Sequence, residues 1–229
     1  MRKLMSLVLV LTAASCSSSA EPDHKGADII AAAKTATGGS AWDAIYIWHE
    51  AGHVISSSGE SSQYEHWADL PSLKTLNASV QGSELHYMIF DGQAAYESTN
   101  RNFEPRSALD LKIIRGGAYL ACFGFFFPNR FPASFRFDET RTDHGVGYDV
   151  VTVSPTGLDS IDVWVDQKTH RIFRLVHSGG QFHTDLSDYR TVGAVTVPFL
   201  SIDEEATIQS DSVAFEPAGS TSFSLAAER

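Results

Sequence analysis

The chain has 229 residues, and a share of 43% apolar residues is ordinary for one folded domain with a sizeable core. It carries 28 acidic against 17 basic side chains, a formal net charge of −11. This surplus of negative charge argues against nucleic acid as a partner and against electrostatic attachment to anionic lipid.

The N-terminus has the layout of a signal peptide over residues 1–15. A basic start, Met1–Lys3, precedes the apolar run Leu4–Ala14, which is too short to span a bilayer. The stretch from Ala13 to Cys16 resembles the lipobox of bacterial lipoproteins, in which the cysteine is lipidated, although Ala13 stands where leucine is commonest. Cleavage after Ala20 is the alternative. Both predict a mature protein outside the cytoplasm.

Lipidation at Cys16 is the favoured interpretation, because a cysteine directly after the apolar run has little other use. By resemblance to Gram-negative sorting rules, Ser17 then indicates anchoring to the outer membrane. Cys122 lies in an apolar run, which is typical of a small buried hydrophobe. With Cys16 lipidated, no intramolecular disulfide is expected.

A polar tether over residues 16–26 leads into the first predicted elements. The alanine-rich segment Ala27–Thr37 predicts a helix that ends at Gly38-Gly39. Short segments with β-branched and aromatic residues follow, separated by turn signals such as Asp91-Gly92. They predict five strands, at Tyr46–Ser57, Gln63–Asp69, Leu73–Val80, Glu84–Phe90 and Gln93–Ser98.

The pattern changes at Pro105. Apolar spacing over Ala108–Phe123 predicts a helix interrupted by Gly116-Gly117, and a dense aromatic loop follows it. The remaining strands are joined so tightly that neighbours must be antiparallel. They are expected at Phe135–Thr142, Tyr148–Ser154, Ser160–Asp166, Arg171–His177, Phe182–Tyr189 and Val195–Phe199, with a last one at Glu205–Phe215. Residues 216–229 are expected to form a loose tail.

These elements predict a mainly β (α+β) domain over residues 27–215, with about 11 antiparallel strands. A sheet of that size curls or closes. The N-terminal helix and the helical, aromatic insert are then available to cover an open face.

Spaced residues throughout this region resemble the lipoprotein-carrier fold, the group that includes LolA, LolB and LppX. The resemblance rests on Gly38-Gly39, Trp42, Ile45, Trp67-Ala68-Asp69, Asp91-Gly92-Gln93, Pro155-Thr156-Gly157, Val165–Thr169, Ile172-Phe173-Arg174, Asp188-Tyr189-Arg190 and Val197-Pro198. It implies a strongly curved, open half-barrel with helices as a lid, which holds acyl chains or other apolar ligands between sheet and lid.

His49-Glu50-Ala51-Gly52-His53 matches the H-E-x-x-H motif of zinc peptidases. On a helix this spacing places both imidazoles on one face for zinc, with the glutamate as general base. The flanking residues favour a strand, and Gly52 adds a further helix penalty. On a strand the two histidines lie about 13 Å apart, too far to bind one zinc ion. The main expectation is therefore no metal site.

The aromatic segment is the most informative candidate for function. Aromatic residues around a concave sheet form an apolar pocket, although they can equally fill the interior as a core. With the resemblance, the pocket is expected to be lined by Phe123, Phe125, Phe126, Phe127, Phe131, Trp67 and Trp164. Arg130 is expected at its mouth as a contact for an acidic headgroup, with Gly116, Gly117 and Gly124 as hinges of the lid.

The sequence thus predicts a non-catalytic envelope lipoprotein of a Gram-negative-type bacterium that needs no cofactor. It would bind or carry a lipid, an acyl chain or the acyl groups of a lipoprotein, with a membrane-anchored protein as a further candidate partner. Two alternatives stay open. One is a zinc hydrolase using His49, Glu50 and His53, and the other is a structural or partner-binding lipoprotein with a filled core.

Overall fold

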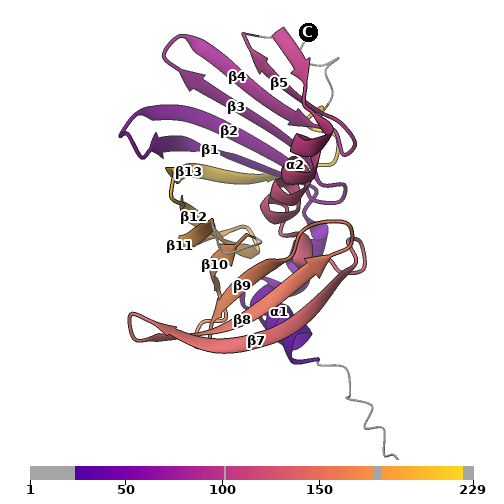
Figure 1. Ribbon diagram of the computed structural model, residues 1–229, viewed down its shortest axis with the longest axis vertical. Coiled ribbons are helices and arrows are strands. Elements are labelled where there is room, and N and C mark those ends of the chain that lie inside the picture. Colours follow the sequence, from indigo (N-terminus) through magenta and orange to yellow (C-terminus); the bar gives the residue numbers. More distant parts are fainter. Residues whose placement is uncertain (1–23, 101, 178–181, 224–229) are drawn as a thin grey trace, which may run out of the picture.

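The computed structural model describes residues 24–100, 102–177 and 182–223. One antiparallel sheet of 13 strands dominates the molecule, and it is curved and open (Figure 1). The strand order is β6-β5-β4-β3-β2-β1-β13-β12-β11-β10-β9-β8-β7. The first and last strands therefore pair in the interior of the sheet, and two consecutive meanders extend from that junction.

The first meander runs from β1 to β6. Its strands are β1 (Ile47–Ser56), β2 (Ser61–Asp69), β3 (Lys74–Gln81), β4 (Glu84–Phe90), β5 (Ala95–Thr99) and β6 (Asn102–Pro105). The first five confirm the predicted strands. The sequence interpretation missed β6, because this strand has four residues, ends in proline and shows no buried alternation.

The second meander runs from β7 to β13. Its strands are β7 (Ala133–Asp143), β8 (Val146–Pro155), β9 (Ile161–Asp166), β10 (Ile172–Val176), β11 (His183–Val192), β12 (Val195–Ile202) and β13 (Ala206–Glu216). Along β9, Val163 and Val165 point into the core while Trp164 points to the opposite face. The predicted curved half-barrel is confirmed, with 13 strands in place of about 11.

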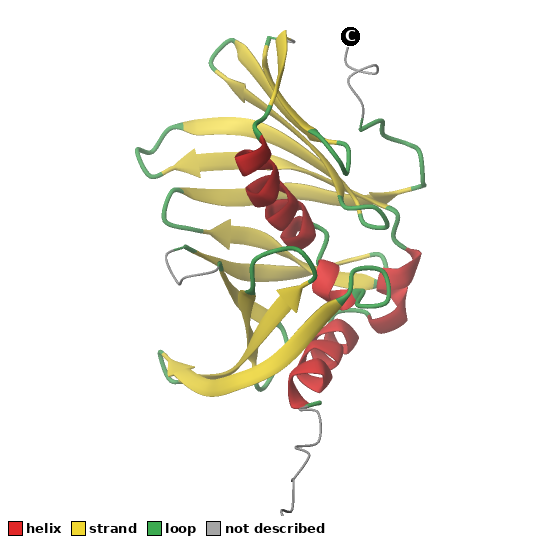
Figure 2. Cartoon of the chain, turned by 45° about the vertical axis from the view of Figure 1, so that its right-hand side comes forward, coloured by secondary structure: helices red, strands yellow, loops and turns green. Residues whose placement is uncertain are grey.

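Two α-helices and two short 3₁₀ helices lie on one face of the sheet (Figure 2). They are α1 (Lys25–Ala36), η1 (Gly39–Ala44), α2 (Ala108–Ala121) and η2 (Gly124–Phe126). We call the face that they cover the lid face and the opposite one the outer face. Among the described residues, no helix is long and apolar enough to cross a membrane.

The largest core cluster lies between α1, η1, η2 and the second meander. Trp42 is its centre, 1% exposed, with ring centroids of Phe123 and Phe126 at 5.3 and 5.4 Å. Its indole Nε1 donates to the carbonyl of Thr37 at 3.1 Å, which ties the end of α1 to the core. Cys122 is fully buried here, as predicted, and burial raises the pKa of its thiol.

The sequence interpretation was wrong about the middle of α2. This helix continues through Gly116 and Gly117 without a break. A capping box fixes its start, because the side chains of Ser107 and Asp110 each accept from the other's backbone N–H. Ala118 then packs against Phe90 of β4 and holds the helix on the sheet.

The predicted loose tail also needs a correction within its described part. Phe223 is 7% exposed and packs on the outer face with Ile47, Leu76 and Ile89. Seven residues beyond β13 therefore bring an aromatic ring back onto the first meander. The reason is that this part of the outer face is apolar.

Candidate ligand-binding cavity

A cavity of about 430 Å³ lies between α2 and the lid face of the sheet. Strands from both meanders contribute to it, so it spans the β1–β13 junction. Most of its wall is apolar, including Val54, Leu120, Phe123, Leu175, Leu186 and Ile208. Its volume is within the range of small-molecule sites in proteins.

Strand alternation decides which side chains of the first meander face the cavity. On β1, Trp48, Glu50 and Val54 line it, while His49 and His53 point to the outer face. On β2, Tyr64 and His66 line it, and the register places His66 opposite Glu50. Residues at even spacing on a strand share a face, so β1 and β2 together bring one polar group of side chains into an otherwise apolar wall.

Glu50 is the centre of that polar group. Its Oε2 accepts a hydrogen bond from the indole Nε1 of Trp48 at 2.9 Å. Its Oε1 accepts from the hydroxyls of Tyr64 and Ser210. Burial raises the pKa of Tyr64, and the neighbouring Glu50 carboxylate raises it further. The phenol therefore stays protonated and remains a donor to the carboxylate.

His66 lies beside Glu50 with its Nδ1 2.7 Å from Oδ1 of Asn77. Burial lowers the pKa of this imidazole, and Glu50 and Asn77 only partly oppose that shift. The ring is therefore neutral at neutral pH. Because its partner Asn77 Oδ1 is an acceptor, Nδ1 carries the proton and Nε2 is left as an acceptor.

The cavity opens toward a second hollow of about 430 Å³ between α2 and the β10–β11 end of the sheet. The two share the lining residues Gly117, Leu120, His177, Thr184 and Asp203. Two large apolar side chains stand exposed at this entrance, Ile113 of α2 at 71% and Phe182 at 54%. The entrance therefore presents exposed apolar surface next to the cavity.

The predicted aromatic residues divide between the cavity and the core. Phe123 lines the cavity and also packs on Trp42. Phe125, Phe126 and Phe127 are at most 4% exposed and fill the core, as the alternative interpretation described. Phe131 is partly buried against the same core. Of the predicted pocket phenylalanines, the geometry places only Phe123 at the cavity.

Arg130 lies away from the cavity mouth. Its guanidinium stacks over the ring of Phe127 at 4.9 Å, and its Nη2 donates to the carbonyl of Asp43 at 3.4 Å. It is not among the residues that line either hollow under α2. The structure therefore assigns it a contact with η1 and gives the cavity no cation at this position.

Both tryptophans predicted for the pocket lie on the outer face. Trp67 stacks on the imidazole of His49 with ring centroids 4.5 Å apart. Trp164 packs beside Tyr148 and lies under the guanidinium groups of Arg141 and Arg174, at 5.2 and 5.0 Å. Neither ring reaches the cavity, because each has the opposite strand parity from its core-facing neighbours.

The secondary structure does not support the zinc alternative, because the motif requires a helix. The H-E-x-x-H segment lies within β1, as its flanks predicted, so Glu50 and the two histidines point to opposite faces. His49 contacts carboxylates of Glu216 at 2.8 Å and Glu65 at 3.1 Å. Within the described ranges, no three His, Cys, Asp or Glu side chains are grouped to hold a metal ion.

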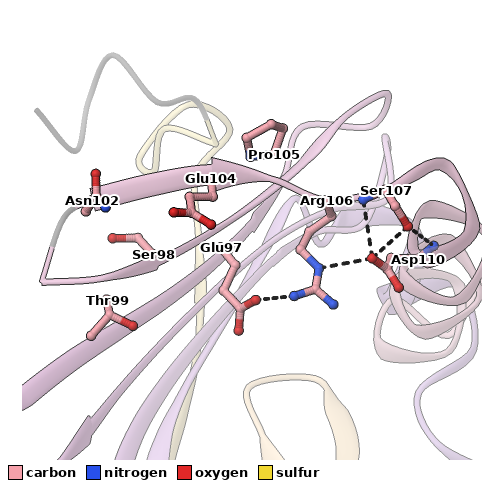
Figure 3. A pocket seen from close by; sticks show the side chains of 9 residues that line it. All are labelled: Glu97, Ser98, Thr99, Asn102, Glu104, Pro105, Arg106, Ser107 and Asp110. Atoms are coloured by element: carbon pink, nitrogen blue, oxygen red, sulfur yellow. Dashed lines mark hydrogen bonds and ion pairs between the residues drawn. The ribbon is translucent and has the colours of Figure 1, made fainter.

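A polar hollow of about 490 Å³ lies where β5 and β6 meet the start of α2 (Figure 3). Arg106 pairs there with Glu97 and, at 3.4 Å, with Asp110. Because its guanidinium is shared between two carboxylates, Arg106 offers no free positive charge to a ligand. These contacts anchor the first turn of α2 and thereby place the lid.

The sequence interpretation missed most residues of the cavity wall. The polar group of Glu50, Tyr64, His66 and Ser210 comes from three strands, and the apolar wall comes from β1, β10, β11, β13 and α2. The signal available in the sequence was strand alternation: Trp48 and Glu50 are two residues apart on one strand, so their side chains lie on the same face. Cys16, the predicted lipidation site, lies outside the described residues.

No protein-family model matches the chain. No curated protein matches it either. Solved structures with the same fold do exist. A LolA superfamily protein from Nitrosomonas europaea superposes with a TM-score of 0.60 and 10% identity, over 87% of this chain and 97% of the other.

Two further structures agree. An outer membrane lipoprotein-sorting protein domain from Vibrio parahaemolyticus gives a TM-score of 0.57 at 9% identity, covering 85% and 94% of the two chains. A DUF1329 family protein from Desulfovibrio piger gives 0.56 at 8% identity, covering 88% and 96%. This chain therefore has a LolA-like fold, an open antiparallel half-barrel with a helical lid.

Proposed function

We propose that this protein is a non-catalytic carrier that binds a lipid, an acyl chain or a similar amphiphile in the cavity under α2. The observation that carries the proposal is a cavity of about 430 Å³, with a largely apolar wall, between a helical lid and a curved sheet. The LolA-like fold of the chain supports it, since a protein described as an outer membrane lipoprotein-sorting domain shares that fold.

Burial of the ligand's alkyl chain supplies the affinity, at about 0.8 kcal/mol for each methylene removed from water. The contacts that hold the middle of α2 on the sheet are few, because its buried apolar cluster contains Phe90, Ala95 and Ala118. A lid held by a small cluster opens at low cost. Gly124 has no room for a side chain, since a Cβ there would lie 2.4 Å from the ring of Tyr119.

The direct test is native mass spectrometry of the full chain purified from its own envelope, followed by extraction of bound small molecules. A co-purifying amphiphile at near-unit occupancy is expected. In parallel, the neutral fluorescent probe N-phenyl-1-naphthylamine is titrated into the delipidated protein, and saturable binding is expected. Absence of both signals would overturn the carrier proposal.

Filling the cavity from the lid should weaken binding without harming the fold. Gly117 lines the cavity, and a Cβ at this position would meet no atom within 4 Å. Gly117→Leu is therefore expected to fold normally and to lower probe affinity by about tenfold or more, because the isobutyl group occupies ligand volume. Equilibrium titration and a thermal melt measure the two effects.

Gly116→Leu is the matched control. This glycine also has open space around it, but it lines only the second hollow, at the entrance to the cavity. Both variants make the same change in helix propensity. Equal loss of binding in the two would show that the helix surface, and not the cavity, holds the probe.

We further propose that the mature protein is anchored in the envelope through Cys16. The signal-peptide layout of residues 1–15 and the lipobox-like residues before Cys16 support this proposal. Replacement of Cys16 by serine is expected to remove the diacylglycerol mass from the mature N-terminus and to shift the protein from the membrane fraction to the soluble one. Intact-mass measurement and fractionation check both. An unchanged mass would favour cleavage after Ala20.

The scaffold alternative predicted a filled interior without a cavity. The interior is filled beneath α1 and η1 by Phe125, Phe126 and Phe127, whereas the space beneath α2 is open. That difference between the two halves of the lid face favours the carrier proposal over a purely structural role.

A further inference from the structure

The charge of the cavity wall is one-sided. Among the described residues that line it, Glu50 and Asp203 carry carboxylates, and none is a lysine or an arginine. Lys112, the lysine that lines the entrance, is paired with Asp159 at 2.7 Å. An anionic headgroup would therefore enter a low-dielectric space beside a carboxylate with no cation to pair it, which is unfavourable.

The Glu50 carboxylate has one acceptor position left. A carboxylate offers about four lone-pair sites, two on each oxygen. Oε1 accepts from both Tyr64 and Ser210, whereas Oε2 accepts from Trp48 alone. The three donors also hold the carboxylate rigidly, so the free position on Oε2 is pre-organised.

The polar neighbours of Glu50 point to the same kind of ligand. The neutral ring of His66 offers an acceptor at Nε2, because Nδ1 is engaged with Asn77. The hydroxyl of Tyr64, which is a donor, is already used by Glu50. Oε2 of Glu50 and Nε2 of His66 are thus two acceptors at the polar end of the cavity, and a ligand that donates hydrogen bonds complements them.

We propose that Glu50 is the polar anchor of the cavity and that it selects amphiphiles whose polar end is a protonated amine over those that end in a carboxylate. The inference rests on the proposed carrier function and adds its headgroup chemistry. The ammonium donates to Oε2 of Glu50, and the alkyl chain lies along Leu120, Leu175 and Ile208.

The test uses three amphiphiles with the same twelve-carbon chain: dodecylamine, dodecanol and dodecanoate. Each displaces N-phenyl-1-naphthylamine from the delipidated full chain at pH 7.4, below its critical micelle concentration. We expect dodecylamine to bind about tenfold or more tightly than dodecanoate, with the alcohol between them, because a charge-assisted hydrogen bond replaces a charge repulsion.

Glu50→Gln removes the charge at nearly constant volume. It is expected to lower dodecylamine affinity by about tenfold and to leave dodecanol affinity unchanged. Glu65→Gln is the matched control, since this residue lies on the neighbouring strand β2 but points to the outer face of the sheet. It makes the same change in net charge and should leave all three affinities unchanged.

A thermal melt checks that the Glu50→Gln variant is folded. Glu50→Asp, which retains the charge, should keep the preference for the amine. Equal displacement by all three amphiphiles, or tighter binding of dodecanoate, would overturn the inference while the carrier function stands. An equal effect of the Glu50 and Glu65 variants would also overturn it. Failure of the naphthylamine probe and all three amphiphiles to bind would overturn both.

Discussion

Replacing Gly52 with alanine is expected to destabilise the protein by about 3 kcal/mol or more, because the new methyl group has no space. A Cβ at this position would lie 2.1 Å from the carbonyl oxygen of Gln209 and 2.8 Å from Cα of Ser210. Both are backbone atoms of β13, so no side-chain rotation can relieve the overlap.

The position of Gly52 in the sheet means that the substitution affects the stability of the whole domain. The register between β1 and β13 shifts between Ala51 and Gly52, which marks a β-bulge. This junction joins the meander β1–β6 to the meander β7–β13. Opening it separates the two halves of the sheet and removes Ser210 from Glu50 at the floor of the cavity.

Equilibrium unfolding in urea, followed by tryptophan fluorescence, measures the change. Gly116→Ala is the control, because this glycine lies within α2 and a Cβ there would meet no atom within 4 Å. It is expected to stabilise the protein slightly, by up to about 1 kcal/mol. A Gly52→Ala variant with the wild-type midpoint would show that the bulge can absorb a side chain.

Phe125→Ala is expected to destabilise the protein by about 3–5 kcal/mol without changing the affinity of the folded protein for an apolar probe. Phe125 is fully buried, with the rings of Phe126 and Phe123 at 5.0 and 5.9 Å. It does not line the cavity. The truncation therefore leaves a void in the core and does not remove a ligand contact.

Urea unfolding gives the stability change, and probe titration under conditions in which the variant is folded gives the affinity. Phe182→Ala is the comparison, since this phenylalanine is 54% exposed at the cavity entrance. Its effect on stability should stay within about 0.5 kcal/mol. Weakened probe binding by folded Phe125→Ala protein would instead place the ligand against the aromatic core.

The strands could be predicted from the sequence because their signals are local. Asp91, for example, accepts hydrogen bonds from the backbone N–H groups of Gln93 and Ala94, both at 2.8 Å, and so closes the turn after β4 by itself. Along β9, strict alternation places Val163 and Val165 on one face and Trp164 on the other, but alternation alone does not say which face lines the cavity. Such patterns depend on residues within a few positions of one another.

The H-E-x-x-H segment shows both what local sequence pattern can predict and what it cannot. Its flanking β-branched and aromatic residues favour a strand, and β1 is a strand. Local pattern also predicted that His49 and His53 are too far apart to bind one zinc ion. It could not reveal that Glu50, on the other face, would contact Tyr64 and Ser210, which are 14 and 160 residues away in the chain.

The sequence by itself thus determined a mainly β chain with antiparallel neighbours, an N-terminal helix and an aromatic insert, and it carried the resemblance to the lipoprotein-carrier fold. Only the tertiary structure decided that β1 pairs with β13, that Phe125–Phe127 fill the core and that the cavity lies under α2 with Glu50 at its floor. The physical reason is the sequence separation of the residues that interact. Propensities and turns act over a few residues, whereas a cavity is the volume left when distant elements pack.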